Sequence, residues 1–111
     1  MRRFLALLTV VAFATTVHAH QLNVFAFVEE GIVVVETKFS NGNLPVSGDV
    51  EVLNAQSEVL MTLPLEKDGT VRFPLDMEVA GEGITIEVTT GEGHEDYWIL
   101  TPEDIARGSG S

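Results

Sequence analysis

Short hydrophobic segments with alternating polar positions follow one another from residue 21 onward, and residues typical of turns separate them. In residues 21–28, Leu22, Val24 and Ala26 fall on one face of an extended chain, whereas Phe25 falls on the other. This period of two predicts a β-strand, and no long stretch shows the spacing of an amphipathic helix. The chain from residue 21 onward is therefore predicted to be built from short strands.

Six further segments show similar patterns, at residues 32–39, 49–52, 58–65, 70–75, 84–90 and 94–100. The turn Glu29-Glu30-Gly31 joins the first two strands as a hairpin, and Asn41-Gly42 marks the next loop. Pro64 is expected to end the fourth strand, because proline cannot donate a ladder hydrogen bond. Seven strands at this spacing predict two antiparallel sheets that share one core.

The inward faces of these strands define the expected core. Each of its members lies on the apolar side of a predicted strand, and the set is Val24, Val35, Val50, Val52, Val59, Met61, Val71, Phe73, Ile84, Ile86 and Val88.

The first nineteen residues have the pattern of a secretory signal peptide. Arg2 and Arg3 form a positive start, residues 4–14 are apolar, and Ala19 is a small residue at the cleavage position. The apolar run is too short to span a bilayer, which takes roughly 20 residues. We predict cleavage after Ala19, export to the periplasm and a mature N-terminus at His20. A cut after Val17 is the second choice, and it would leave the metal-binding sequence His18-Ala19-His20.

The remaining chain is long enough for one domain. Removal of 19 of the 111 residues leaves 92, which suffices for a single core, and the absence of cysteine excludes disulfides and thiolate ligands. We expect the sandwich at residues 20–101 and a short helical turn with a flexible tail at residues 102–111. Thr101 is a suitable N-cap for a turn at Pro102–Ala106.

The charge of the mature chain favours a cation as ligand. Loss of Arg2 and Arg3 changes the formal net charge from −11 to −13. Such a chain has no basic patch to neutralise phosphate, so nucleic acid and anionic lipid surfaces are not expected partners. The simpler explanation for most of this charge is that it keeps the solvated strand faces soluble.

Two histidines of the mature chain are candidate metal ligands. The α-amine and imidazole of His20 can chelate one ion, and His94 begins the last strand with Asp96 on the same face. Parallel first and last strands would place both histidines at one end of the domain, whereas antiparallel strands would separate them by roughly 20 Å. Amine, imidazoles and a carboxylate suit Ni²⁺, Co²⁺ or Cu²⁺. The alternative is that His94 is a surface histidine and His20 an ordinary chain end.

Two resemblances add to this interpretation. The segments 40–46, 50–52 and 68–73 resemble the transthyretin-like or carboxypeptidase-regulatory-like sandwich. The segments 20–29 and 91–94 resemble the small periplasmic accessory subunits of nickel and cobalt uptake systems of the energy-coupling-factor type. These resemblances imply an all-β chain, a single antiparallel β-sandwich of the immunoglobulin or transthyretin-like kind after a signal-peptide helix. They also imply a Ni²⁺ or Co²⁺ cargo and membrane transporter subunits as partners.

An enzyme is not expected. The mature chain has no cysteine nucleophile and no glycine-rich phosphate loop. Its two histidines are both assigned to the candidate metal site, so no histidine is left for a catalytic triad of serine, histidine and aspartate. The chain is also too short to resemble the copper-dependent polysaccharide oxidases. Two alternatives stay open, a periplasmic copper-binding carrier and a structural or protein-interaction module that binds no metal.

Overall fold

The elements of the fold follow the predicted order along the chain. The computed structural model describes residues 21–45, 47–91 and 93–108, so the prediction for residues 1–19 concerns residues outside the described ranges. The elements are β1 (Leu22–Glu29), β2 (Ile32–Phe39), β3 (Gly48–Leu53), β4 (Val59–Pro64), β5 (Thr70–Pro74), α1 (Met77–Ala80), β6 (Ile84–Thr90), β7 (Glu95–Leu100) and α2 (Pro102–Gly108). In the described ranges, neither helix is long and apolar enough to cross a membrane.

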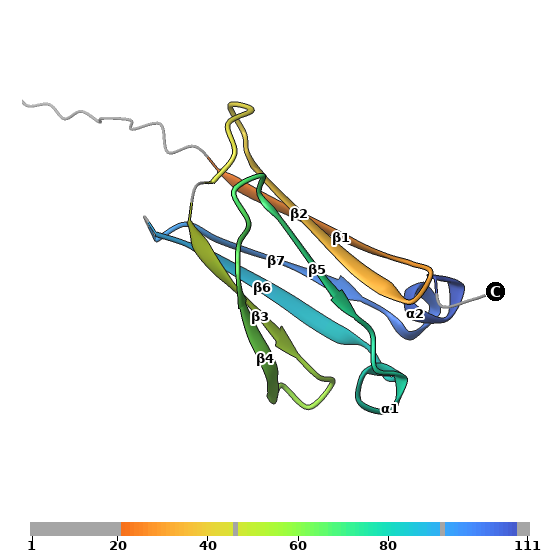
Figure 1. Ribbon diagram of the computed structural model, residues 1–111. Helices are drawn as coiled ribbons and strands as arrows, with labels where there is room; N and C mark the ends of the chain where they lie inside the picture. Colours follow the sequence, from red (N-terminus) through yellow and green to blue (C-terminus); the bar gives the residue numbers. More distant parts are fainter. Residues whose placement is uncertain (1–20, 46, 92, 109–111) are drawn as a thin grey trace, which may run out of the picture.

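The seven strands form two antiparallel sheets that face each other (Figure 1). One sheet has the order β1-β2-β5 and the other has the order β4-β3-β6-β7. The chain changes sheets after β2, β4 and β5, which is the Greek-key connectivity of immunoglobulin-like sandwiches. The predicted all-β fold, a single antiparallel sandwich of seven strands, is confirmed.

The hairpin β1–β2 has the predicted tight turn. Glu29 pairs with Ile32, and the two residues between them have positive φ angles, 52° at Glu30 and 80° at Gly31. Two successive positive φ angles define the mirror-image turn that matches the twist of paired strands. The turn therefore sets the register of β1 on β2 along their full length.

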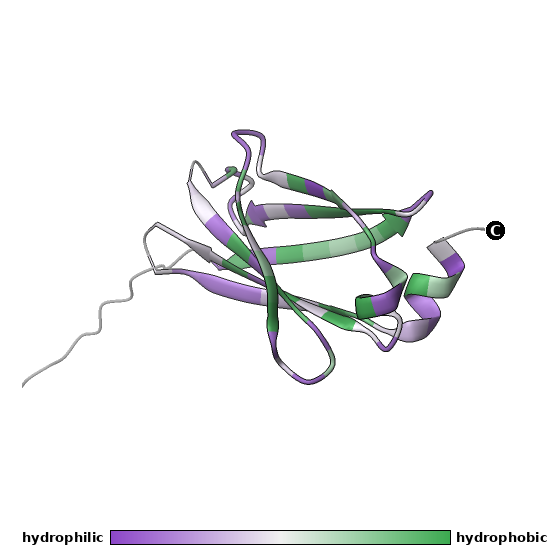
Figure 2. Cartoon of the chain, turned by 60° about the horizontal axis from the view of Figure 1, so that its bottom comes forward, coloured by the Kyte–Doolittle hydropathy of each residue, from purple (hydrophilic) through white to green (hydrophobic). Residues whose placement is uncertain are grey.

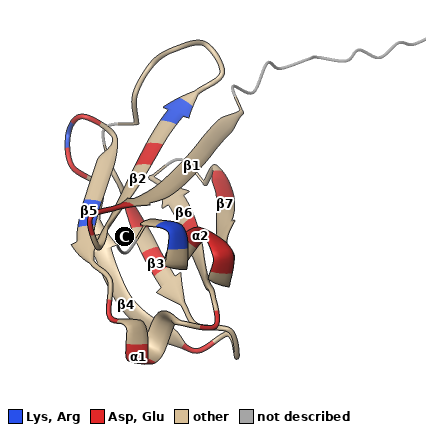
Figure 3. Cartoon of the chain, turned by 90° about the vertical axis from the view of Figure 1, so that its right-hand side faces the viewer, with Lys and Arg blue, Asp and Glu red and all other residues tan. Residues whose placement is uncertain are grey.

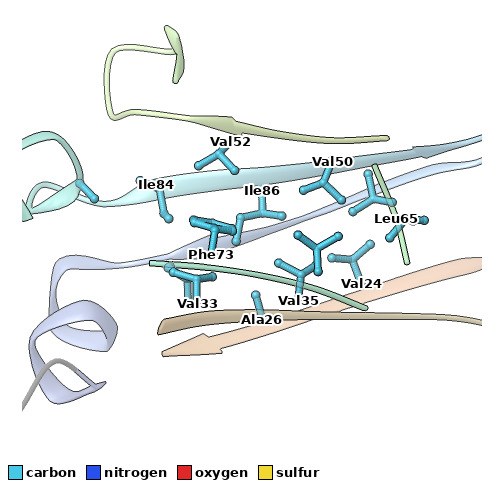
Figure 4. Close-up of a cluster of buried hydrophobic side chains, with 14 of the residues drawn as sticks. Val24, Ala26, Val33, Val35, Val50, Val52, Leu65, Phe73, Ile84 and Ile86 are labelled. Atoms are coloured by element: carbon cyan, nitrogen blue, oxygen red, sulfur yellow. The ribbon is translucent and has the colours of Figure 1, made fainter. Parts of the chain in front are cut away.

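The core lies between the sheets, where aliphatic side chains from both inner faces meet (Figure 4). Nine of the eleven predicted core residues are buried, and Met61 packs against them from a partly buried position. Val33, Val35, Val50, Ile86 and Val88 have no exposed surface at all. Among the described residues, the buried core runs from Leu22 in β1 to Ile105 in α2.

The prediction that Val59 faces the core was wrong. Its side chain is 53% exposed, whereas Leu60 packs partly against the core. The register of β4 on β3 shifts at this point. Val52 pairs with Met61 but Leu53 pairs with Val59, so Leu60 has no partner residue on β3. One extra residue in an edge strand reverses the alternation of faces, and this bulge turns Val59 towards solvent.

The helix α2 is longer than predicted and belongs to the packed structure. The Thr101 hydroxyl accepts a hydrogen bond from the Asp104 backbone N–H at 3.2 Å, and the Asp104 carboxylate accepts one from the Thr101 N–H at 3.0 Å. This reciprocal arrangement is a capping box. Figure 2 shows hydrophobic and hydrophilic residues side by side on α2, and its Ile105 is completely buried in the core.

The short helix α1 was not predicted, because four residues are too few to show a helical period. Its N-cap is Asp76, whose side chain accepts a hydrogen bond from the Glu78 backbone N–H at 3.0 Å. Ala80 is the residue of α1 that reaches the core.

Candidate metal centre

The first and last strands lie beside each other and run in the same direction. The backbone N–H of Val24 donates a hydrogen bond to Asp96 Oδ2 at 2.9 Å, and the Phe25 ring meets the Trp98 ring edge to face at a centroid distance of 5.0 Å. The contacts advance together along both strands, and the ribbons of β1 and β7 run in the same direction in Figure 1. β1 and β7 are edge strands of different sheets, and as parallel neighbours they begin at the same end of the domain.

His94 lies at that end, immediately before β7. Its ring contacts the Phe39 ring edge to face, with centroids 5.2 Å apart, and Phe39 pairs with Leu22 at the start of β1. The His94 carbonyl accepts a hydrogen bond from the Thr90 N–H at 2.9 Å, which closes the turn between β6 and β7. The His94 ring therefore lies against the last residue of β2, which pairs with the first residue of β1.

The Nδ1 atom of His94 is buried and has no hydrogen-bond partner among the residues that the structure describes. A buried imidazole nitrogen without a partner is unfavourable, because it has lost its bond to water. A proton donor or a metal ion at this position would remove the penalty. This nitrogen is the feature of the site that a surface histidine would not have.

Asp96 is half-buried and is the second residue of β7, two positions after His94. One carboxylate oxygen is already bonded to the Val24 N–H, so Asp96 links the two edge strands. The same bond fixes the orientation of the carboxylate, in the way that hydrogen bonds hold the ligands of many metal sites. Two positions along a strand span about 6.6 Å, which lets both side chains reach one ion.

The third predicted ligand, His20, lies outside the described residues. The next residue, Gln21, is held to the end of β2 by two hydrogen bonds. Its N–H donates to Ser40 Oγ at 3.1 Å, and the Ser40 N–H donates to its carbonyl at 2.8 Å. Sequence reasoning did not single out Phe39 or Ser40, because their contacts cross between strands and leave no local signal.

The described ranges contain no group of three histidine, cysteine or acidic side chains that could hold a metal ion. Two of the three predicted ligands are described residues: His94 immediately before β7, and Asp96 within it. A complete site would need His20 as well, or the carboxylate of Glu92, which is also outside the described ranges.

The described residues as a whole carry many more acidic than basic side chains. The basic residues of the described ranges are Lys38, Lys67, Arg72 and Arg107, and Figure 3 shows them scattered among many acidic residues. The carboxyls whose pKa values are displaced belong to other parts of the molecule. A hydrogen bond from the Thr70 hydroxyl lowers the pKa of Asp68, and one from the Thr101 backbone N–H lowers the pKa of Asp104.

A second exposed feature lies at the opposite end of the β1–β7 pair. Phe25 is 46% exposed and Trp98 is 36% exposed, and with α2 they line a groove of about 310 Å³. Exposed aromatic side chains at a groove are common where proteins meet partners. This groove is separate from His94 and contains none of the predicted metal ligands.

The geometry defines this chain as an immunoglobulin-like β-sandwich whose first and last strands meet at a histidine-bearing end. No protein-family model matches the sequence, and no curated protein matches it either. The functional argument therefore rests on the residues of this chain.

Proposed function

We propose that the mature protein binds a divalent transition metal in the periplasm, as an accessory component of a nickel or cobalt uptake system. The ligands are the α-amine and imidazole of His20, the imidazole of His94 and the carboxylate of Asp96. The observation that supports this best is the buried Nδ1 of His94, which has no partner among the described residues, in a ring that contacts Phe39, the β2 residue paired with Leu22. Nitrogen and oxygen donors of this kind suit Ni²⁺, Co²⁺ and Cu²⁺.

The ligand role of the amine can be tested by changing only the N-terminus. A chain that starts at His20 should bind Ni²⁺ or Cu²⁺ at least tenfold more tightly than one that starts Met-His20, or about 1.4 kcal/mol. The added methionine converts the amine into an amide, which is a far poorer donor. Calorimetric titration measures both affinities, and equal values would exclude the amine.

The roles of the two described ligands need separate variants. His94→Ala should weaken binding in both N-terminal forms. Asp96→Asn should weaken binding while the fold is kept, because an asparagine oxygen can still accept the bond from the Val24 N–H. Asp49→Asn is the matched control, since it removes one negative charge from an exposed residue outside the site. Equal effects of the two asparagine variants would show that net charge alone attracts the metal.

The same titrations separate the alternative functions. Nitrogen and oxygen ligands usually bind Cu²⁺ more tightly than Ni²⁺. A preference for Cu²⁺ that is clearly larger than this usual difference would favour a copper carrier. Absence of binding in every form would favour a protein-interaction module, for which the aromatic groove beside α2 is the surface to examine.

Export and transport are supported by the sequence pattern and the family resemblance, and each has its own test. N-terminal sequencing of the exported protein should begin at His20, and retention of Met1 would contradict the signal peptide. Cells that lack this protein should accumulate less radioactive nickel or cobalt than cells that produce it, and unchanged accumulation would contradict a role in uptake.

A further inference from the structure

Three aromatic rings lie close together where β1 and β7 approach α2. The rings of Phe25 and Phe27, two positions apart on β1, have centroids 5.6 Å apart, and Phe25 meets Trp98 of β7 at 5.0 Å. Phe25 is 46% exposed and Trp98 is 36% exposed. Burial of such apolar surface is favourable, so these rings provide binding energy to any partner that covers them.

The rings belong to the groove of about 310 Å³ beside α2. β1 and β7 supply its apolar side, and α2 supplies Asp104, Arg107 and Gly108. The end of α2 is fixed against the β1–β2 turn, because the Gly31 N–H donates to the Gly108 carbonyl at 3.2 Å. The groove is therefore built from packed elements. Its volume is at the lower end of the range for ligand sites and suits one large side chain of a partner.

Acidic side chains surround this groove. Glu29 and Glu30 directly follow the last groove residue of β1, and Glu103 and Asp104 lie in the first turn of α2. Figure 3 shows acidic positions on both the β1–β2 turn and α2. Arg107 contacts Asp104 at 3.4 Å, whereas Glu29, Glu30 and Glu103 have no ion pair among the described residues. The surroundings of the groove therefore carry a net negative charge.

From these features we propose that the groove binds a cationic segment of another protein, in which a large apolar side chain is flanked by arginine or lysine. The apolar side chain packs against Phe25 and Trp98, and its basic neighbours meet the surrounding carboxylates. Cations are also attracted to the faces of exposed aromatic rings. A second copy of this chain fits less well, because each copy has a formal net charge of −11 and like charges repel.

Trp98 makes the groove directly observable, because it is the only tryptophan of the chain. The probes are four synthetic peptides without aromatic residues, which repeat Arg-Leu, Ser-Leu, Glu-Leu or Arg-Ser. Added to the full chain, the Arg-Leu peptide should shift the Trp98 emission to shorter wavelength. It should bind at least about tenfold more tightly than each of the other three. Salt at about 1 M should weaken its binding, because it screens the charges.

Two aromatic variants locate the binding surface. Phe25→Ala should lower the affinity for the Arg-Leu peptide by about tenfold, because it removes part of the apolar side of the groove. Tyr97→Ala is the matched control, since Tyr97 is an exposed aromatic residue of β7 that does not line the groove. It should change the affinity by less than about twofold. Both variants keep Trp98 as the reporter.

Two double variants test the surrounding charge. Glu29→Gln combined with Glu103→Gln should lower the affinity for the Arg-Leu peptide by about fivefold, because it removes two carboxylates beside the groove. Asp49→Asn combined with Glu66→Gln removes the same charge from exposed residues that do not line the groove. This control should change the affinity by less than about twofold.

Several results would overturn this inference. Equal affinities for the Arg-Leu and Ser-Leu peptides would show that the partner need not be cationic. Equal affinities for the Arg-Leu and Arg-Ser peptides, or equal losses in the two double variants, would show general attraction to an acidic protein. A shift of the Trp98 emission with protein concentration alone would show that a second copy fills the groove. Failure of all four peptides to bind would also refute the inference, while the metal titrations stay an independent test of the proposed function.

Discussion

Val52 and Val59 show how strongly the environment of a residue determines its contribution. Val52 is 1% exposed in the centre of the core, whereas Val59 is 53% exposed beyond the bulge in β4. Both are valines in adjacent paired strands, and both were predicted to be buried. Removal of the same two methyl groups should therefore have different consequences at the two positions.

Val52→Ala should lower the free energy of unfolding by about 2 kcal/mol, because it removes two buried methyl groups from a filled core. Val59→Ala should change it by less than about 0.5 kcal/mol, as most exposed substitutions do. Urea denaturation followed by circular dichroism measures both values. Similar losses for the two variants would show that Val59 faces the core.

Among the elements, α2 combines a local cap with a distant contact. The capping box holds its first turn, Ile105 is buried in the core, and the Gly31 N–H donates to the Gly108 carbonyl at 3.2 Å. The hydrogen bond from the Thr101 backbone N–H, with a further one from its hydroxyl, lowers the pKa of Asp104 below its ordinary value of 3.8. The charged form of Asp104 is therefore more stable in the folded protein than in the unfolded chain.

This pKa shift predicts the pH dependence of the cap. A lowered pKa contributes stability that is fully present above pH 3.8 and disappears as the pH falls through the lower folded value. Asp104→Asn should therefore destabilise the protein at pH 7, and the difference from the parent should shrink towards pH 3. Thermal unfolding of both proteins across this range measures the difference, and a constant difference would contradict the linkage.

Over the whole molecule, the charges are distributed unevenly between the two sheets. Lys38 and Arg72 lie on strands of the sheet β1-β2-β5, whereas the described strands of the other sheet carry no basic residue (Figure 3). On that second sheet, Glu51 pairs directly with Glu87 across β3 and β6. Like charges opposite each other on neighbouring strands are destabilising.

Neutralising one member of this pair should stabilise the protein. We expect Glu51→Gln to raise the free energy of unfolding by about 0.2–1 kcal/mol at low salt, and by less at 1 M salt, where the charges are screened. Glu36→Gln is the matched control, because Glu36 lies two positions from Lys38 on the other sheet. Glu36→Gln should leave the free energy of unfolding unchanged. An equal increase in both variants would show that only the total charge of the protein matters.

The sequence alone was sufficient for the features that depend on near neighbours. The first strand was predicted at residues 21–28, within one residue of its observed bounds, and so were the turn that includes Glu30 and Gly31 and the helix start at Pro102. Alternation, turn conformation and capping are decided within a few residues. The inward face of β6 was predicted for the same reason. The bulge before Met61 was not predicted from the sequence, because a register shift depends on how β4 pairs with β3.

The assembly of the candidate site was decided by the tertiary structure alone. Residues His94 and Asp96 could be named from the sequence, and so could the condition that the first and last strands be parallel. Whether that condition held depended on contacts between residues 72 positions apart, such as the bond from Val24 to Asp96. The edge-to-face contact of Phe39 with His94 and the hydrogen bonds between Ser40 and Gln21 likewise join residues that are far apart in the sequence. No local pattern encodes such contacts, because they form only when the two sheets close over their shared core.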